Sequence, residues 1–282
     1  MIAKKWVEPG TLYVVGTPIG NQSDWTFRAL DVLAEVDRVL AEDTRETRQV
    51  FHAHDIHTPL VSLHEHNWRQ RLPDIRRWLE AGEALALVSD RGMPAVSDPG
   101  QEVVDYCRTE GFPVSVVPGP SAVVTAFAAS GFPHPFIFWG FLPRQGRARD
   151  TRLEEIRQSP YTQILYEAPH RLADTVDELA RHLGDDYPVF IGREMTKRFE
   201  EFWRGTLGAL RQRSEWRGEW VIVLGPKPPE TTRAGEIDWS LLAARVRAQQ
   251  ESGMAINEAI KRVAGEAGVT KRELYRYIHQ TD

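Results

Sequence analysis

Residues 85–100 read Leu-Ala-Leu-Val-Ser-Asp-Arg-Gly-Met-Pro-Ala-Val-Ser-Asp-Pro-Gly, and this stretch indicates the fold of the first half of the chain. Its four apolar residues predict a buried strand that ends at Ser89 and Asp90. A loop with glycines, prolines and a second Ser-Asp pair follows, and a helical pattern begins at Gln101. Ligands of open α/β sheets bind beyond the carboxyl ends of such strands. The stretch therefore predicts one wall of a binding site, although an ordinary capped turn has the same pattern.

Strands alternate with helices on both sides of this stretch. Apolar runs predict strands, and apolar residues spaced three and four apart predict helices. The strands are expected at residues 11–15, 38–42, 60–63, 85–88 and 113–117, and the main helices at 26–36, 68–79 and 122–129. This alternation is typical of a mostly parallel sheet with helices on both faces.

The second half of the chain changes character after the breaker-rich segment at residues 131–136. Strands are predicted at residues 137–140, 162–166, 188–192, 200–204 and 219–224, the last two with an antiparallel pattern. Residues 226–233 have a linker composition, and residues 239–280 predict three helices. We therefore expect an N-terminal α/β domain over residues 1–120, a second α/β domain over 121–230 and a helical module over 236–282.

The composition is ordinary for a soluble globular protein, with 41% hydrophobic residues in a chain of 282. No apolar run is long enough to span a bilayer, and the first ten residues lack the apolar core of a signal peptide. The single cysteine, Cys107, allows no intrachain disulfide, which suits the cytoplasm. Five histidines between residues 52 and 66 fit a solvated surface better than a metal site, so no metal is expected. Because the formal net charge is −5, any contact with nucleic acid needs a local basic patch.

The loop after the first strand, Gly16-Thr-Pro-Ile-Gly20, differs from both familiar phosphate-binding motifs. It lacks the Gly-x-Gly-x-x-Gly pattern and the Gly-Lys-Ser/Thr pattern, and Pro18 removes a backbone donor. A ligand without phosphates is therefore favoured. With loops 89–100 and 118–122 it would form three walls of one cleft, in which small residues and the carboxylate of Asp90 suit an adenosine with a cationic group.

An ordered set of short strings resembles the tetrapyrrole methylase family, in particular its RNA-modifying branch. The strings are GTLYVVGTPIGN (10–21), AEDTR (41–45), VSDRGMP (88–94), PGPSA (118–122), YEAPHR (166–171), REMTK (193–197) and GEWVIV (218–223). The resemblance runs from Thr11 to about Leu224, and the C-terminal helices are similar too. Each string alone is weak, but the set in this order is highly specific.

The resemblance implies two α/β domains of tetrapyrrole-methylase type, with S-adenosylmethionine bound in the cleft between them, in a homodimer without membrane association. It also implies methyl transfer to a cytidine 2′-hydroxyl of small-subunit (16S) ribosomal RNA, with free RNA or the assembled subunit as partner. By motif, the cofactor would be bound by Pro18, Ile19, Asp90, Met93, Ser121, Ala122 and Tyr166.

The chain departs from the family pattern in two places. The family's central loop usually reads Ser-Asp-Ala-Gly-Thr-Pro, whereas this chain has Arg91 and Met93, and Gly16 stands where a proline is common. Arg91 adds a cation beside a positively charged sulfonium unless its side chain points away, toward RNA. The side-chain details at residues 91 and 93 are therefore left open.

Methyl transfer to a hydroxyl requires the oxygen, the methyl group and the sulfur to be aligned, and a base or a cation near the oxygen helps. Three strings each place a carboxylate beside a cation near a strand end: Glu42, Asp43 and Arg45; Glu167, His170 and Arg171; Arg193, Glu194 and Lys197. Glu167 and Lys197 are the predicted catalytic residues. Ion pairs at a domain interface are the alternative interpretation.

Two basic regions are predicted to contact RNA. The first is the loop over residues 143–149 with its continuation, where arginine side chains could bind phosphates: Arg144, Arg147, Arg149 and Arg152. A solvated loop is the alternative. The second resembles a helix-turn-helix, with segments 255–263 and 270–278 on either side of Gly265–Gly268. Thr270 would cap the second helix, which presents Lys271, Arg272 and Arg276, whereas Leu274 and Tyr277 are predicted core residues.

Two rival functions remain. The same fold could methylate a tetrapyrrole or another small molecule, and the chain could be a non-catalytic protein that binds RNA or the ribosome. The C-terminal helices and the arginine-rich segment argue against a small substrate, which needs neither. Arg91 keeps the non-catalytic alternative open.

Overall fold

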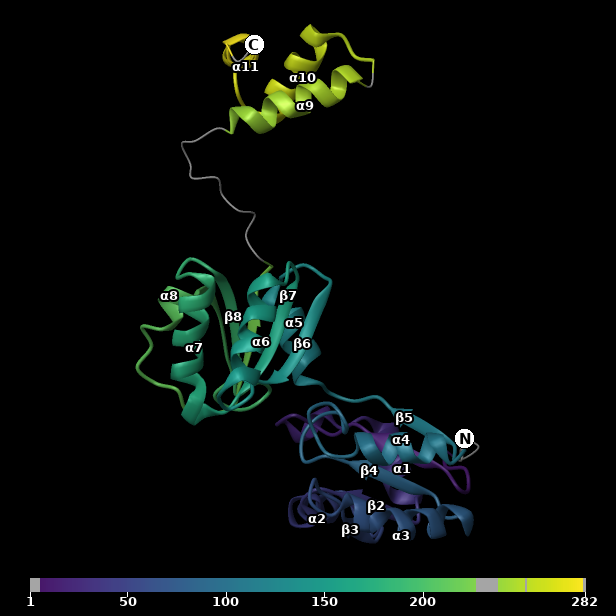
Figure 1. The fold of residues 1–282 in the computed structure, drawn as a ribbon. Coiled ribbons are helices and arrows are strands. Elements are labelled where there is room, and N and C mark those ends of the chain that lie inside the picture. The colour runs from purple at the N-terminus through teal and green to yellow at the C-terminus, as the bar shows by residue number, and fades with distance from the viewer. Residues whose placement is uncertain (1–5, 227–237, 252, 281–282) are drawn as a thin grey trace. The chain divides into compact units, whose positions relative to one another are not determined.

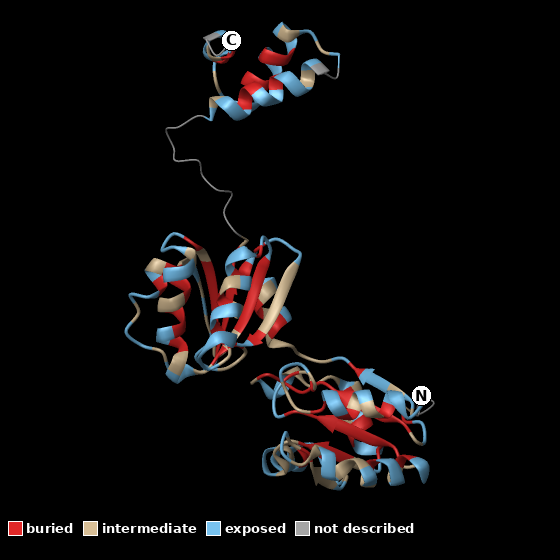
Figure 2. Ribbon diagram, in the orientation of Figure 1, coloured by how far each residue is buried: buried red, intermediate tan, exposed pale blue. Residues whose placement is uncertain are grey.

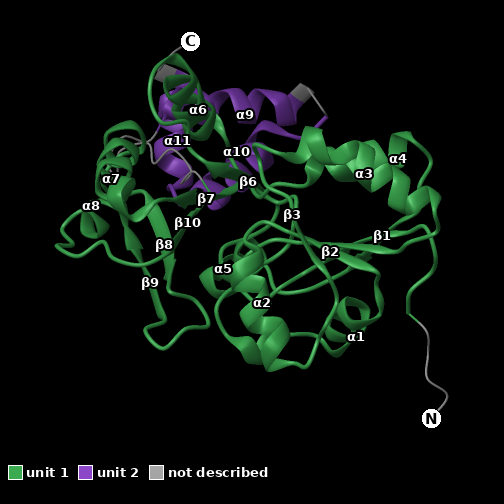
Figure 3. Cartoon of the chain, turned by 90° about the horizontal axis from the view of Figure 1, so that it is seen from below, with its two compact units in different colours: residues 1–227 green, residues 228–282 purple. Residues whose placement is uncertain are grey.

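The computed structural model describes residues 6–226, 238–251 and 253–280. Its contacts divide the chain into two compact units, residues 1–227 (unit 1) and residues 228–282 (unit 2), coloured separately in Figure 3. Within the described residues, unit 1 contains two five-stranded sheets and unit 2 contains three helices (Figure 1). The predicted linker lies outside the described residues except for Pro226, so the three-part division stays a prediction.

The first sheet is parallel throughout, as the alternating pattern predicts, with the strand order β3-β2-β4-β1-β5. Its strands are β1 (Leu12–Val15), β2 (Arg38–Ala41), β3 (Leu60–Ser62), β4 (Leu85–Val88) and β5 (Val114–Val117). Leu12 of β1 pairs with Leu85 of β4 and with Val114 of β5. The loops that follow these three neighbouring strands therefore leave the same edge of the sheet.

Helices cover both faces of this sheet because successive strand residues point to opposite faces. On one face, Tyr13 and Val15 of β1 pack with α1 (Phe27–Glu35) and α2 (Thr44–Ala53). On the other face, Leu12 packs with α3 (Trp68–Glu80) and α4 (Gln101–Thr109). The three central strands, β1, β2 and β4, are buried between these layers, whereas the edge strands β3 and β5 are partly exposed, as Figure 2 shows.

The second sheet is mixed and has the order β6-β7-β10-β8-β9. Strand β6 (Phe136–Phe141) runs parallel to β7 (Thr162–Glu167). Strand β10 (Trp220–Leu224) is antiparallel to β7 and to β8 (Pro188–Arg193), and β9 (Glu201–Thr206) is antiparallel to β8. Helices α6 (Arg147–Gln158), α7 (Pro169–Leu183) and α8 (Leu207–Leu210) pack on one face, and α5 (Ala122–Ser130) packs on the other.

Helix α6 corrects the expectation of a basic loop over residues 143–149. The helix begins at Arg147, so only residues 143–146 form the predicted loop. Leu153 and Ile156, three positions apart, are fully buried against the second sheet. The many charged residues of the helix hide this short apolar stripe in the sequence, and the stripe holds the helix on the sheet.

Unit 2 consists of α9 (Trp239–Glu251), α10 (Ile256–Ala267) and α11 (Lys271–Gln280), which confirms the three predicted helices. Thr270 caps α11 as predicted: the Glu273 amide donates to the Thr270 hydroxyl at 3.2 Å, and the Thr270 amide donates to the Glu273 carboxylate at 3.0 Å. The predicted turn is shorter than expected. Gly265 lies inside α10, and Gly268, with φ of 65°, ends the helix.

Candidate functional site

Three loops form one continuous wall at the edge of the first sheet. The Thr17 amide donates to the Gly92 carbonyl at 2.8 Å, and the Gly92 amide donates to the Thr17 carbonyl at 3.2 Å. The loops after β1 and β5 touch through glycines, because a Cβ on Gly16 would lie 2.7 Å from the backbone of Gly119. No side chain fits between them. The predicted assembly of loops 16–21, 89–100 and 118–122 is therefore confirmed.

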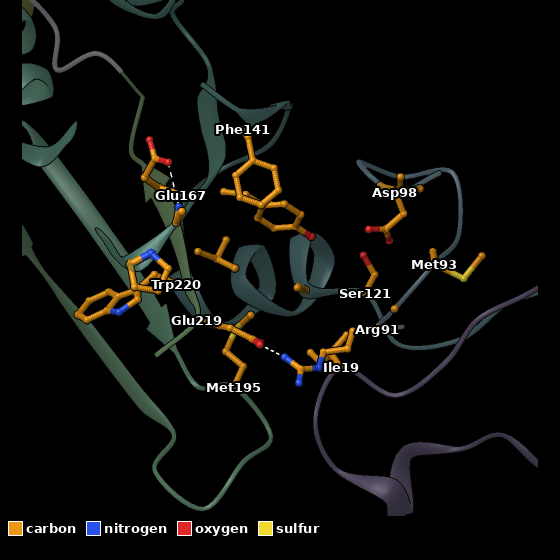
Figure 4. Close-up of a pocket in the computed structure, with 17 residues that line it drawn as sticks. Ile19, Arg91, Met93, Asp98, Ser121, Phe141, Glu167, Met195, Glu219 and Trp220 are labelled. Atoms are coloured by element: carbon orange, nitrogen blue, oxygen red, sulfur yellow. Dashed lines mark hydrogen bonds and ion pairs between the residues drawn. The ribbon is translucent and has the colours of Figure 1, made fainter. Parts of the chain in front are cut away.

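This wall borders a cavity of about 410 Å³ within unit 1, which we call the interlobe cavity (Figure 4). The first lobe, residues 6–120, lines it with Ile19, Arg91, Gly92, Met93, Val96 and Asp98. The second lobe, residues 121–226, lines it with Ser121, Ala122, Phe141, Tyr166, Glu167, Ala168, Pro169, Met195, Glu219, Trp220 and Val221. The lining is mainly apolar and carries a small number of charged groups, which is typical of a small-molecule site.

The structure separates the predicted cofactor residues into two groups. Ile19, Met93, Ser121, Ala122 and Tyr166 line the interlobe cavity. Pro18 and Asp90 instead line a neighbouring cavity of about 450 Å³ beside α2, which we call the α2 cavity. The Asp90 carboxylate accepts a hydrogen bond from the Asp43 amide at 3.0 Å. The expected position of Asp90 is therefore corrected, and the aspartate that lines the interlobe cavity is Asp98.

Two carboxyl groups near the cavity have raised pKa values. Burial raises the pKa of Asp98 to about 6, a hydrogen bond with Ser89 opposes the shift, and the charge of Asp90 adds to it. Burial raises the pKa of Glu42 to about 7, and the charges of Asp90, Asp98 and Asp43 contribute further. Carboxylates that are desolvated and crowded in this way bind cations favourably. The electrostatics of this wall therefore suit a ligand with positive charge.

The side chain of Arg91 contacts the second lobe. Its guanidinium forms an ion pair with Glu219, drawn as a dashed line in Figure 4. Lys197 Nζ lies 2.8 Å from Glu219 Oε2 and 3.1 Å from Glu194 Oε1. We call Arg91, Glu194, Lys197 and Glu219 the interlobe charge cluster. Because Glu219 balances the charge of Arg91, the departure from the family pattern at residue 91 is compatible with a cationic ligand.

The segment around Lys197 packs onto the first lobe. A Cβ on Gly20 would lie 2.6 Å from Lys197 Cγ, and the Asn21 amide donates to the Thr196 hydroxyl at 3.0 Å. Thr196 has φ of 66° and Glu194 has φ of 47°, so both adopt the left-handed region that side chains disfavour. Ala95 and Ser97 in loop 89–100 do the same, with φ of 65° and 64°. Such conformations gather at functional sites, and here they occur in both lobes beside one cavity.

Glu167, a predicted catalytic residue, is engaged inside the second lobe although it borders the cavity. Its side chain has no exposed surface. One carboxylate oxygen accepts from the Thr175 hydroxyl at 2.7 Å, and the other accepts from the Ala168 amide at 2.9 Å. Arg171 Nη2 lies 3.4 Å from the same carboxylate. One oxygen thus ties the end of β7 to α7 and the other is held by the adjoining backbone, so the geometry favours a structural role.

Arg149, predicted to bind RNA, is buried with 7% of its surface exposed. Its guanidinium donates to Glu178 at 2.7 Å, to the Thr175 hydroxyl at 2.9 Å and to the Pro143 carbonyl at 2.9 Å. The prediction for Arg149 is wrong because these donors are satisfied inside the second lobe. We call Arg149, Glu167, Arg171, Thr175 and Glu178 the buried charge network.

The other predicted RNA-binding residues remain accessible. Arg144 and Arg147 are exposed before and at the start of α6. Arg152 is partly covered, pairs with Glu155 and lies over the Trp139 ring. In unit 2 the basic side chains of α11 are exposed: Lys271, Arg272 and Arg276. Leu274 is fully buried and Tyr277 packs in the same cluster, as predicted for core residues.

Several residues of the interlobe cavity were not predicted. Asp98, Met195, Glu219 and Trp220 line it. A signal for Asp98 was present, because the Ser-Asp pair of residues 89–90 recurs at 97–98. Glu219 and Trp220 belong to the string at 218–223. Its apolar residues indicate a strand, but the sequence does not show which end of that strand borders a cavity.

Two features are absent from residues 6–226, 238–251 and 253–280. They contain no group of three histidine, cysteine, aspartate or glutamate side chains arranged to hold a metal ion. None of their helices has the length and apolar character needed to cross a membrane.

Comparison with known proteins gives a consistent result. The profile of the family described as Tetrapyrrole (Corrin/Porphyrin) Methylases matches residues 11–211. The chain is 43% identical over 277 residues to ribosomal RNA small subunit methyltransferase I of Bacillus subtilis, covering 96% of this chain and 94% of that protein. The protein of the same name from Halalkalibacterium halodurans is 44% identical, with 97% and 96% covered, and that from Synechocystis is 38% identical, with 95% and 96% covered.

Solved structures share the fold. A cobalt precorrin-4 methyltransferase of cobalamin biosynthesis aligns with a TM-score of 0.59 and 19% identity, covering 78% of this chain and 98% of that one. A uroporphyrin-III-C-methyltransferase from Thermus thermophilus aligns with a TM-score of 0.54 and 21% identity, covering 77% and 94%. At these identities the likeness concerns the fold alone.

Proposed function

The chain belongs to the tetrapyrrole (corrin/porphyrin) methylase family, and we propose that it transfers the methyl group of S-adenosylmethionine to small-subunit ribosomal RNA. The acceptor is the 2′-hydroxyl of a cytidine. Methyltransferases of this family use S-adenosylmethionine, so the cofactor follows from family membership, whereas the acceptor is the part that requires an experiment.

The proposal depends on the share of this chain that each group of relatives covers. The family profile ends at residue 211, inside unit 1. The ribosomal RNA methyltransferases cover 95–97% of the chain, which requires their alignment to include most of unit 2. The tetrapyrrole enzymes cover only 77–78% of it. A helical unit with a basic helix is therefore shared with enzymes named for an RNA substrate, which supports RNA over a small molecule.

The interlobe cavity fits the cofactor. Its volume of about 410 Å³ and apolar lining suit an adenosine with a short side chain. Asp98 provides a desolvated carboxylate with a raised pKa, which favours a ligand with a sulfonium and an ammonium group. Ile19, Met93, Ser121, Ala122 and Tyr166 would surround the remainder. When bound, the cofactor supplies an electrophilic methyl group.

The chain contributes mainly positioning. Alignment of the acceptor with the methyl donor can lower the barrier by about 7–11 kcal/mol. The three loops, locked together by Gly16 and Gly119, provide a rigid wall for it. Of the two predicted catalytic residues, Lys197 is the less enclosed: its side chain is 21% exposed, and its ammonium pairs with Glu219, which lines the interlobe cavity although Lys197 itself does not. Its role is to steady negative charge on the acceptor oxygen.

RNA contacts are assigned to exposed basic side chains in both units: Arg144 and Arg147 in unit 1, and Lys271, Arg272 and Arg276 in unit 2. Replacing the three residues of α11 by alanine should weaken RNA binding and reduce its salt dependence. Cofactor affinity should stay unchanged, because none of the three lines the interlobe cavity.

The protein acts in the cytoplasm as a homodimer in this proposal. Apolar side chains are exposed on three elements of unit 1, namely α1, β5 and α5: Phe27 (90%), Val116 (47%) and Val124 (58%). Helix α5 also has an almost entirely apolar sequence, which is typical of a helix that is covered on all sides. A Val124→Glu variant should sediment as a monomer, and a dimer of unchanged stability would remove α5 from the interface.

The test is transfer of tritiated methyl from S-adenosylmethionine to purified small subunits, to naked 16S RNA and to a porphyrinoid. We expect label in RNA, at a position where the phosphodiester bond resists alkaline cleavage, because a 2′-O-methyl group blocks attack by the hydroxyl. Label on a base, which leaves the bond cleavable, would overturn the 2′-hydroxyl. Label only in the porphyrinoid would establish the small-molecule rival. Cofactor binding without any transfer would favour the non-catalytic one.

A further inference from the structure

The α2 cavity is a second pocket at the same edge of the first sheet, and it is open to solvent on the side of Glu46 and Gln49. It is bounded by the ends of β1 and β4, by α2 and by the short 3-10 helix η1 (Gln22–Asp24) with Trp25. Its volume of about 450 Å³ is within the range of ligand sites. Neither the family strings nor the cofactor assignment accounts for most of its lining.

The α2 cavity adjoins the interlobe cavity. Arg91 lines both of them. Pro18 and Ile19 are consecutive in the chain, and each lines a different one of the two cavities. A base in the α2 cavity would thus leave its ribose near Arg91, at the border that the two cavities share. A methyl acceptor has to reach this border, because its oxygen must lie about 3–3.5 Å from the methyl carbon.

The polar groups of the α2 cavity are of the kinds that read base edges. Glu46, Gln49 and Ala53 follow one another at helical spacing on α2 and line the cavity. Within the described part of the chain, the Glu46 and Gln49 side chains form no hydrogen bond or ion pair. Asp90 adds a second carboxylate, of which only one oxygen is engaged, by the Asp43 amide.

Aromatic rings complete the lining. The Trp25 indole is fixed by a hydrogen bond from its Nε1 to Gln22 Oε1 at 3.1 Å. The ring of His54 meets it edge to face, with centroids 6.4 Å apart. Unstacked RNA bases are held by aromatic rings and by hydrogen bonds to their edges. The α2 cavity offers both kinds of group within one space.

The charged side chains of the α2 cavity favour the base of a nucleotide over its phosphate. The cavity lining includes two carboxylates, and its arginine, Arg91, is paired with Glu219. A phosphate is therefore disfavoured. A base with an exocyclic amino group is favoured, because carboxylates accept hydrogen bonds from the N4 amino group of cytosine. Uracil presents a carbonyl at that position, which repels them.

We propose that the α2 cavity binds the unstacked base of the target nucleotide and selects cytosine over uracil through Glu46, with Trp25 as the stacking surface. The ribose of that nucleotide then lies at the boundary formed by loop 16–20 and Arg91, facing the interlobe cavity. This assignment deepens the proposed function and rests on it, since it requires an RNA acceptor.

The test compares two RNA substrates, one with the mapped target cytidine and one with uridine in its place. The wild-type protein should prefer cytidine by about 10- to 100-fold in kcat/KM. Glu46→Gln should bring this ratio close to one, because an amide can both donate and accept. Trp25→Ala should reduce transfer to both RNAs, and Trp25→Phe should restore part of it.

The matched control is Glu102→Gln. Glu102 is exposed in the first turn of α4, as Glu46 is in the first turn of α2, and it lines neither cavity. Its variant should keep the wild-type ratio, and cofactor affinity by equilibrium dialysis should be the same in all variants. If the wild-type protein methylates RNA and the Glu46→Gln variant keeps the full preference for cytidine over uridine, the proposed base site is overturned and the proposed function stands. A wild-type protein that methylates no RNA overturns the proposed function, and the base site with it.

Discussion

The second lobe and the boundary between the lobes each contain a cluster of arginine and glutamate side chains, and the two clusters differ in their surroundings. In the buried charge network, the side chains of Arg149 and Glu167 are 9% and 0% exposed. In the interlobe charge cluster, those of Arg91 and Glu219 are 47% and 51% exposed. The same chemistry therefore serves two purposes: the first cluster holds one lobe together, and the second joins two lobes beside a cavity.

The difference teaches that the pairing of charges says little until their burial is known. Breaking a buried pair leaves an unpaired charge away from water, which costs about 3–5 kcal/mol. Breaking an exposed pair costs about 1 kcal/mol or less, because water replaces the lost partner. Substitutions in the buried charge network should therefore lower stability, whereas substitutions in the interlobe charge cluster should mainly change ligand binding.

The largest expected effect is in the buried charge network. Arg149→Ala should lower the free energy of unfolding by about 3–5 kcal/mol, since Glu178 loses its cation and the buried Glu167 keeps only Arg171. Urea denaturation measures this. Arg152→Ala, on the same helix and paired with Glu155, is the control and should change it by less than about 1 kcal/mol. Equal losses in the two variants would remove the distinction between buried and exposed pairs.

The next largest effect concerns Asp98, whose carboxylate lines the interlobe cavity and lies outside the buried charge network. Asp98→Asn should weaken binding of S-adenosylmethionine by about 10- to 100-fold, as expected for a lost charged partner. Isothermal titration calorimetry measures the affinity. Asp105→Asn on the exposed side of α4 should bind normally. If Asp98→Asn bound as tightly as the wild type, the cation would have to be held elsewhere.

The pH dependence of cofactor binding follows from the same group. The pKa of Asp98 is raised to about 6, so the carboxyl group is ionised above this pH and neutral below it. Because a cation binds the ionised form, affinity should fall as the pH is lowered through about 6, and the neighbouring Glu42, whose pKa is raised to about 7, adds a shallower slope around that pH. Dialysis across this range tests it, and binding of uncharged adenosine should vary much less. The Asp98→Asn variant should lose the part of this dependence near pH 6; an unchanged slope near pH 6 in the variant assigns the titration to another group.

The smallest effect is expected in the interlobe charge cluster. Glu219→Gln should change the free energy of unfolding by less than about 1 kcal/mol. It leaves the charge of Arg91 unbalanced beside the cofactor, so affinity should fall by less than about fivefold. Adding Arg91→Ala should restore it, because the unbalanced charge is then gone. If the double variant binds worse than Glu219→Gln, Arg91 assists binding and the charge-balance account fails.

Strand positions and the meeting of three loops could be predicted because apolar runs and adjacent parallel strands follow from local pattern. The roles of individual charged residues could not. Glu167 and Glu194 occur in similar strings, each with a carboxylate near a cation, but Glu167 is enclosed by α7 whereas Glu194 lies in the interlobe charge cluster. Arg149 was misplaced for the same reason, since a helix with two well-spaced apolar residues turns it inward. Burial is set by tertiary packing, which the strings do not contain.

The contact between Gly16 and Gly119 has a consequence for how ligands enter. The two backbones touch without side chains between them, and the Gly16 amide donates to the Val117 carbonyl at 3.0 Å, so the loops after β1 and β5 are tied together where they leave the sheet. The loop after β4 is bonded to the first of them through Thr17 and Gly92. This side of the interlobe cavity therefore behaves as a fixed floor. Any opening that admits a cofactor or releases its product has to come from the second lobe, at the ion pair between Arg91 and Glu219.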